Sequence, residues 1–197
     1  MEKYIPCRVC GAEAEFFDHA QVLGKYDIGY YHCPVCDFVE TEEPHWLDEA
    51  YSSAITDTDI GLVGRNFLLA KQVRAVLSFC LPHAASFLDY GGGYGMFVRL
   101  MRDAGFPFEW YDKYSENLFA KHCEKKQEHY DVVTAFELLE HLPDPVLEIE
   151  KLLTLGDSVL FSEELSTAPP VRLTNGGIMR RNMGSTSPFI RKRHCAI

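Results

Sequence analysis

The sequence feature that most constrains the fold is a glycine-rich turn between a strand and a helix. Residues 86–90 read as a short buried strand, Gly91, Gly93 and Gly95 follow, and residues 96–104 show helical apolar spacing. Glycine adopts positive φ at little cost and lets the backbone pass close under a bulky ligand. Strand, glycine turn and helix in this order are typical of one unit of a parallel α/β sheet.

Apolar periodicity on both sides of the turn extends this α/β pattern. Before Pro82, apolar residues at helical spacing predict an amphipathic helix of about 19 residues. After the turn, apolar runs predict strands at residues 108–112, 130–137 and 158–162, with a helix at 146–155. We therefore expect an α/β fold with a Rossmann-like sheet.

The glycine spacing, together with the acid that precedes it, separates this turn from a dinucleotide site. The pattern runs Asp89-x-Gly-x-Gly-x-Gly, with two residues from the second glycine to the third, where nicotinamide-binding turns have three. This disfavours a nicotinamide-dependent dehydrogenase. The pattern instead resembles motif I of the class I S-adenosylmethionine-dependent methyltransferases. The strand ending at Asp112 and the Glu-x-x-Glu-His-Leu run after the strand at 130–137 are also common in that family, and the resemblance covers about residues 59–164.

The resemblance implies site residues at the ends of three strands. The implied cofactor-binding residues are Asp89, Tyr90, Gly91, Gly93, Gly95, Asp112 and Glu137. Each has an alternative role: Asp89 can cap a strand end, Tyr90 can simply pack, and Asp112 can lie in an exposed turn instead of accepting hydrogen bonds from the ribose hydroxyls. His141 is the candidate catalytic base, although a histidine before Leu-Pro often caps a helix or bonds to the backbone.

Paired cysteines near the N-terminus predict a second, smaller module. Two Cys-x-x-Cys pairs, separated by 22 residues, consist of Cys7, Cys10, Cys33 and Cys36. In a chain without an export signal, such pairs indicate metal or thiol chemistry before disulfides. Two such turns can close a tetrahedral site with four thiolates about 2.3 Å from one Zn²⁺, which leaves no open position and makes the metal structural. Residues 15–17 and 29–32 can supply short strands, as in a zinc ribbon; chance placement of the pairs is the alternative.

The combination of zinc pairs and glycine turn is similar to bacterial methyltransferases that carry an N-terminal zinc-binding domain. Some of these act on a carbon of nucleotide-linked deoxy-keto sugars, which implies a small-molecule acceptor. Methylation of carbon requires a base to form an enolate, and residues 1–164 offer no convincing one. The alternative function is a non-catalytic zinc-bearing module that binds cofactor without turnover.

Charge and hydropathy exclude several partners. The formal charge is −10, from 19 Lys and Arg against 29 Asp and Glu, which disfavours nucleic acid and anionic membrane surfaces. No apolar run reaches the roughly 18–20 residues of a membrane span, and no apolar signal segment opens the chain. A cytoplasmic location is therefore expected.

The C-terminal segment differs from everything before it. All 29 acidic residues lie before residue 165, whereas residues 165–197 carry six basic residues, no acid and no apolar period. Codons permitted for this stretch, read one nucleotide upstream, can spell an aromatic, His-rich phrase typical of such a methyltransferase. We interpret the segment as the product of a frame shift, with a genuine divergent tail as the alternative. The sheet is then expected to be incomplete after the strand at 158–162, which is the fifth strand in the order of the family that it resembles, with an unpaired edge.

These observations predict four segments along the chain. They are a zinc-binding ribbon at 1–45, a connector with a short helix at 46–60, a methyltransferase core at 61–164 and an irregular basic tail at 165–197.

Overall fold

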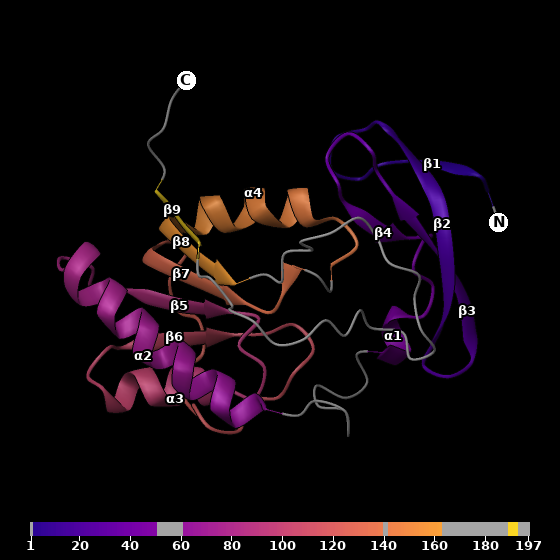
Figure 1. Ribbon diagram of the computed structural model, residues 1–197. Coiled ribbons are helices and arrows are strands. Elements are labelled where there is room, and N and C mark those ends of the chain that lie inside the picture. The colour runs from indigo at the N-terminus through magenta and orange to yellow at the C-terminus, as the bar shows by residue number, and fades with distance from the viewer. Residues whose placement is uncertain (1, 51–60, 140–141, 163–188, 193–197) are drawn as a thin grey trace. The chain divides into compact units, whose positions relative to one another are not determined.

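The computed structural model describes residues 2–50, 61–139, 142–162 and 189–192. Two sheets organise these residues, and the chain divides into two compact units, the first of which holds Met1–Ala50 and the second the larger sheet. Figure 1 shows the elements of each unit. The described helices include none that is long and apolar enough to cross a membrane.

The first unit is a four-stranded antiparallel sheet in the order β1-β2-β3-β4. Its strands are β1 (Tyr4–Pro6), β2 (Glu13–Val22), β3 (Tyr26–His32) and β4 (Val39–Thr41). The β2–β3 hairpin turns at Leu23 and Gly24, which both have positive φ, the conformation that tight hairpins need. The two predicted ribbon strands are confirmed and are longer than expected. A four-residue helix, α1 (Leu47–Ala50), follows.

The larger sheet has the order β6-β5-β7-β8-β9. Its strands are β5 (Phe87–Tyr90), β6 (Phe108–Tyr111), β7 (Tyr130–Phe136), β8 (Gly156–Ser162) and β9 (Phe189–Lys192). β5 to β8 run parallel, so their carboxyl ends meet at one edge of the sheet. All four parallel strands were predicted from apolar runs, and their burial on both faces explains why the runs are nearly continuous.

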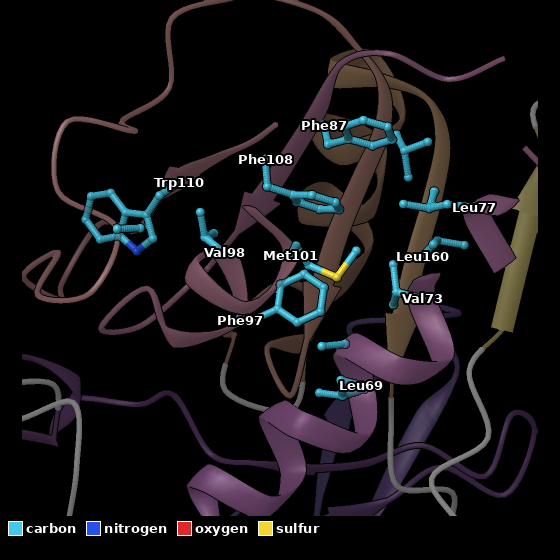
Figure 2. Packing of buried hydrophobic residues seen from close by; sticks show 13 residues of the cluster. Leu69, Val73, Leu77, Phe87, Phe97, Val98, Met101, Phe108, Trp110 and Leu160 are labelled. Carbon is cyan, nitrogen blue, oxygen red and sulfur yellow. The ribbon is translucent and has the colours of Figure 1, made fainter. Parts of the chain in front are cut away.

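Helices cover both faces of this sheet. α2 (Leu62–Cys80) and α3 (Met96–Asp103) pack side by side on one face, as Figure 1 shows, and α4 (Pro145–Leu155) buries Leu152. Figure 2 shows the apolar core between α2, α3 and the sheet. Its large members are Leu69, Val73, Leu77, Phe87, Phe97, Val98, Met101, Phe108 and Leu160. The apolar stripe of α2 recurs at helical spacing, which is why the sequence predicts this helix correctly.

The larger sheet has two further pairings besides its four parallel strands. Between β6 and β7 along the chain, a single parallel bridge joins Trp110 to Glu124. The expected unpaired edge after β8 is wrong, because β9 pairs antiparallel with β8 from Ser158↔Lys192 to Phe161↔Phe189. The expected irregular tail therefore contains one strand. The rest of that tail, residues 163–188 and 193–197, and residues 51–60 of the predicted connector lie outside the described residues.

Candidate functional site

The glycine turn after β5 has the backbone that the sequence predicts. Gly91 and Gly95 have φ of +76° and +83°, a left-handed conformation that side chains rarely adopt. A Cβ at Gly91 would lie 2.9 Å from Leu138 Cδ1, and one at Gly95 would lie 2.8 Å from Asn117 Oδ1. Both positions therefore require glycine, for conformation and for space.

The sheet holds the middle of the turn by hydrogen bonds. The Gly91 amide donates to the carbonyl of Tyr111 at 2.8 Å, and the Gly93 carbonyl accepts from Trp110 Nε1 at 2.9 Å. A Cβ placed on Gly93 would meet nothing within 4 Å, although its φ of +52° still favours glycine. The turn is thus fixed from the side of β6 and open at Gly93, which is the arrangement of a backbone cradle.

Asp112 lies immediately after β6 and orients this cradle. Its Oδ2 accepts from the Gly93 amide at 2.9 Å, while its Oδ1 accepts from the amides of Tyr114 and Ser115, both at 2.8 Å. A carboxylate has about four acceptor positions, so about one remains for a ligand. Asp112 therefore lies in a turn, which was the alternative role, and it also binds the glycine loop; its contact with a ribose stays a prediction.

Asp89 is buried beneath the turn, with 4% of its surface exposed. Its Oδ1 accepts from Thr134 Oγ1 on β7 at 2.6 Å, and its Oδ2 lies 2.8 Å from where a Cβ on Gly92 would stand. Burial raises the pKa of Asp89 to about 7, and the negative charge of Asp112 adds to the rise, while the Thr134 hydroxyl opposes it. Among the described residues Asp89 thus ties β5 to β7 through Thr134, and its role toward the turn or a cofactor stays a prediction.

Tyr90 faces the opposite side of the sheet from Asp89, because successive side chains of a strand alternate. Its ring packs 4.9 Å from the ring of Tyr111. Lys151 of α4 donates to the Tyr90 hydroxyl, and its Nζ lies 5.0 Å from the Tyr90 ring centroid. The described partners of Tyr90 are protein groups, and its contact with a cofactor stays a prediction.

Glu137 follows β7 at the same carboxyl edge. It has a φ of +50°, which is a strained conformation for a residue with a side chain. Ser162, fully buried at the end of β8, holds it by two bonds: the Ser162 hydroxyl donates to Glu137 Oε1 at 2.7 Å and accepts from the Glu137 amide at 3.2 Å. The predicted base His141 lies outside the described residues.

The four paired cysteines converge as predicted. Their Sγ atoms all lie within 4.8 Å of one another, with Cys7 to Cys36 at 3.6 Å and Cys10 to Cys33 at 3.5 Å. A tetrahedron with metal–sulfur bonds of about 2.3 Å has sulfur–sulfur edges of about 3.8 Å. The spacing and chemistry of these thiols therefore fit one Zn²⁺ held by four thiolates.

The two cysteine turns have matching backbone hydrogen bonds. The amides of Gly11 and Asp37 donate to the carbonyls of Cys7 and Cys33, both at 2.9 Å, and Gly11 and Asp37 both have positive φ. Burial opposes ionisation of Cys33, but amides of Cys36 and Val35 directed at its sulfur prevail, and its pKa is lowered to about 7. Each turn thus aims its two thiols at a common point.

A buried ion pair links the first cysteine turn to β4. The Arg8 amide donates to Glu40 Oε1 at 3.2 Å, and Arg8 Nε lies 3.5 Å from Glu40 Oε2. Sequence reasoning missed this pair, as it missed Thr134 and Ser162. The sequence feature that could have pointed to these residues is a polar side chain at a buried strand position, because such side chains usually have a specific hydrogen-bond partner.

Comparisons with known proteins agree with this geometry. The methyltransferase domain family matches residues 65–195. The ubiquinone biosynthesis O-methyltransferase of Aliivibrio fischeri (strain MJ11) is 42% identical over 53 residues, which are 25% of this chain and 23% of that protein. The match thus spans about a quarter of the curated relative's length.

Solved methyltransferase structures are similar at low identity. Magnesium protoporphyrin IX methyltransferase from Synechocystis PCC 6803 with bound SAM has 17% identity and a TM-score of 0.38, covering 58% of this chain and 69% of that one. The plantazolicin methyltransferase BpumL in complex with SAH has 17% identity and a TM-score of 0.39, covering 59% and 51%. Because the family match at residues 65–195 spans more than half of the 197 residues, the chain belongs to the methyltransferase domain family.

Proposed function

We propose that the protein transfers a methyl group from S-adenosylmethionine to a small-molecule acceptor. The observation that carries the proposal is the glycine cradle: a left-handed turn at the carboxyl end of β5, bound to β6 and open at Gly93. Ligands of open α/β sheets bind at the carboxyl ends of the strands. Family membership supplies the reaction class.

The residues around the cradle fit this cofactor. The turn of Gly91, Gly93 and Gly95 would receive its methionine part, with the open space at Gly93, where an added Cβ would meet nothing within 4 Å. Asp112 would accept from a ribose hydroxyl with the acceptor position that its three amide partners leave. Asp89 and Glu137 would define the floor and one side of the site. When bound, the cofactor supplies an electrophilic methyl group on a positively charged sulfur.

The chain's own contribution to such a displacement is alignment and exclusion of water. The carbonyl of Tyr111 and the side chains of Trp110 and Asp112 hydrogen-bond to the turn, and these bonds fix its position relative to the sheet. Glu137, held by Ser162, lies at the same edge and would face the acceptor side. The site is thus preorganised by groups that belong to three strands.

The acceptor class that we propose is a nucleotide-linked sugar methylated at carbon. The support is the resemblance of the paired cysteines and glycine turn to enzymes of that kind. Such a reaction needs a base, and His141 is the candidate that follows β7. If turnover were intact after His141→Ala, this assignment would be eliminated.

We also propose that Zn²⁺ binds the four cysteines in a structural role. Four thiolates leave no position for substrate or water, so the ion would stabilise the β1–β4 sheet. The apolar cluster around the cysteines is small and consists of Cys7, Ala14, Tyr31 and Cys33, while Ala20 and Ile28 are buried elsewhere in the sheet. A small core of this kind is typical of domains that depend on a metal.

Isothermal titration of the zinc-loaded protein with S-adenosylmethionine and with its demethylated product tests the proposal. We expect both to bind, and we expect Asp112→Asn to weaken binding about tenfold or more, because Gly93 loses its charged acceptor. Asp103→Asn on the outer face of α3 is the matched control and should leave binding unchanged. Absence of heat in folded protein would overturn the proposal, whereas binding without turnover on any sugar nucleotide would favour the non-catalytic module.

A further inference from the structure

The surface formed by α2 and α3 has the opposite charge to the rest of the protein. Whereas the whole chain has 19 basic against 29 acidic residues, these two helices carry mostly cations. Their charged residues are Arg65, Lys71, Arg74, Arg99, Arg102 and Asp103. With five cations and one acid, these two helices carry a net positive charge in an acidic protein, and Arg99 pairs with Asp103 at 3.0 Å.

A groove runs along this face between α2 and the segment that follows α3. It is a shallow, wide-open hollow of about 720 Å³, lined by Lys71, Arg74, Ala75, Ser78, Phe79, Ala104 and Phe106. On α2, Phe67, Lys71, Arg74, Ala75 and Ser78 recur at helical spacing on the side opposite the buried stripe of Leu69, Val73 and Leu77. Among the described residues, no ion pair neutralises Lys71 or Arg74. The groove thus has an apolar interior and a cationic rim.

Large apolar side chains are exposed beside the groove. Phe79 is 84% exposed and Phe67 is 58% exposed, both on α2. A second hollow of about 260 Å³ lies on the other side of α3, where Arg99, Arg102 and Lys121 accompany the half-exposed Phe119. Exposed aromatic residues interspersed with cations are typical of a surface that binds a partner.

We propose that the α2–α3 face is a docking surface for an acidic amphipathic helix of a partner protein. The groove would take the apolar side of that helix, with Phe79 as an anchor, while Lys71 and Arg74 would pair with carboxylates on its flanks. Helix-in-groove binding uses this combination of apolar anchors and charged flanks. The inference rests on residues of the second unit alone and does not depend on the methyl-transfer reaction.

Charge and shape favour this occupant over other anionic partners. A nucleic acid would bring a continuous line of phosphates against a protein of formal charge −10, which repels it over distances beyond the groove. An anionic membrane surface would meet the same long-range repulsion from the net negative charge of the protein. An acidic amphipathic helix would place apolar side chains in the groove and carboxylates next to the cations of its rim.

Fluorescence anisotropy with designed peptides tests the proposal. The probe is a labelled helical peptide of about 20 residues with Leu on one side and Glu on both flanks; the comparison probe carries Lys in place of every Glu. We expect the acidic probe to bind with a dissociation constant below about 100 μM and the basic probe to bind at least tenfold more weakly.

Two variants locate the binding. Lys71→Glu combined with Arg74→Glu should weaken the acidic probe about tenfold or more, because two attractions become repulsions. Phe79→Ala should weaken it about tenfold through loss of the anchor, with the urea midpoint unchanged because Phe79 is exposed. Lys3→Glu combined with Lys25→Glu, in the first unit, is the control with the same change in net charge.

Several results would overturn the proposal. They are failure of the acidic probe to bind folded wild-type protein, equal binding of the basic probe, and equal weakening by the control variant. Phosphatidylglycerol vesicles and an oligothymidine strand are run in parallel. If either binds more tightly than the peptide and loses affinity in the Lys71 and Arg74 variant, the surface belongs to a membrane or a nucleic acid instead.

Discussion

The Asp89→Asn variant should have a higher free energy of unfolding than the wild type at high pH, and the difference should be smaller at low pH. Asp89 is a buried carboxyl group whose pKa lies at about 7, well above its ordinary value of 3.8, because burial penalises the charged form. Between these two pH values the folded state holds more protons than the unfolded state, so the wild-type free energy of unfolding falls as pH rises. An amide of the same shape has no such charge to bury.

The magnitude follows from the pKa and the pH. Each pH step of one between 3.8 and about 7 costs the folded wild type about 1.4 kcal/mol, which amounts to about 4 kcal/mol at pH 8 and about 2 kcal/mol at pH 5.5. The gain of Asp89→Asn over wild type should therefore grow by about 2 kcal/mol from pH 5.5 to pH 8. Asn can still accept from Thr134, which lies 2.6 Å from the carboxyl oxygen.

Urea unfolding of zinc-loaded protein at both pH values measures the difference. Taking variant minus wild type cancels the titration of other groups, such as the cysteine thiols. Asp103→Asn, exposed on α3, provides the control and should show no comparable pH dependence. A difference between Asp89→Asn and wild type that stays constant from pH 5.5 to pH 8, or that shrinks, would refute the reasoning.

Three further predictions concern the turn, the metal and the Glu137 clamp. Gly95→Ala should cost about 1–3 kcal/mol in urea unfolding, because φ is +83° and the new Cβ would lie 2.8 Å from Asn117 Oδ1. Cys33→Ser, or a chelator added to the wild type, should reduce the bound zinc from one ion per chain to none, as measured by mass spectrometry. The same treatments should abolish the contribution of β1–β4 to the circular dichroism spectrum. Ser162→Ala should cost about 1–2 kcal/mol, because the carboxylate of Glu137 loses the hydroxyl that donates to it at 2.7 Å; an unchanged unfolding midpoint would contradict this clamp.

Local patterns explain why much of the fold could be predicted. The expected strand at 86–90 and helix at 96–104 correspond to Phe87–Tyr90 and Met96–Asp103, since a glycine turn with apolar runs on both sides has few alternatives. Each cysteine turn was likewise predictable, because it is defined within four residues. These features depend on short-range geometry, whereas the convergence of the two turns also needs the β2–β3 hairpin between them.

Long-range pairing explains what could not be predicted. The expected unpaired edge of β8 was wrong because β9 comes from a segment with no apolar period, and its pairing uses backbone groups that any sequence offers. The contacts of Tyr90 with Tyr111 and Lys151 could not be predicted, because both residues are distant in sequence. Asp112 was expected near ribose, and nothing local indicates that it holds Gly93.

The sequence by itself determined the kinds of site: a glycine turn at a strand end with an acid after the next strand, and four paired cysteines nearer the N-terminus. Residue type and spacing suffice for this, because backbone conformation and ligand chemistry are properties of a few neighbouring residues. Only the tertiary structure decided which side chains hold that site, because Thr134, Trp110 and Ser162 act across strands. Hydrogen bonds between strands depend on register, and register is fixed by packing of the whole sheet.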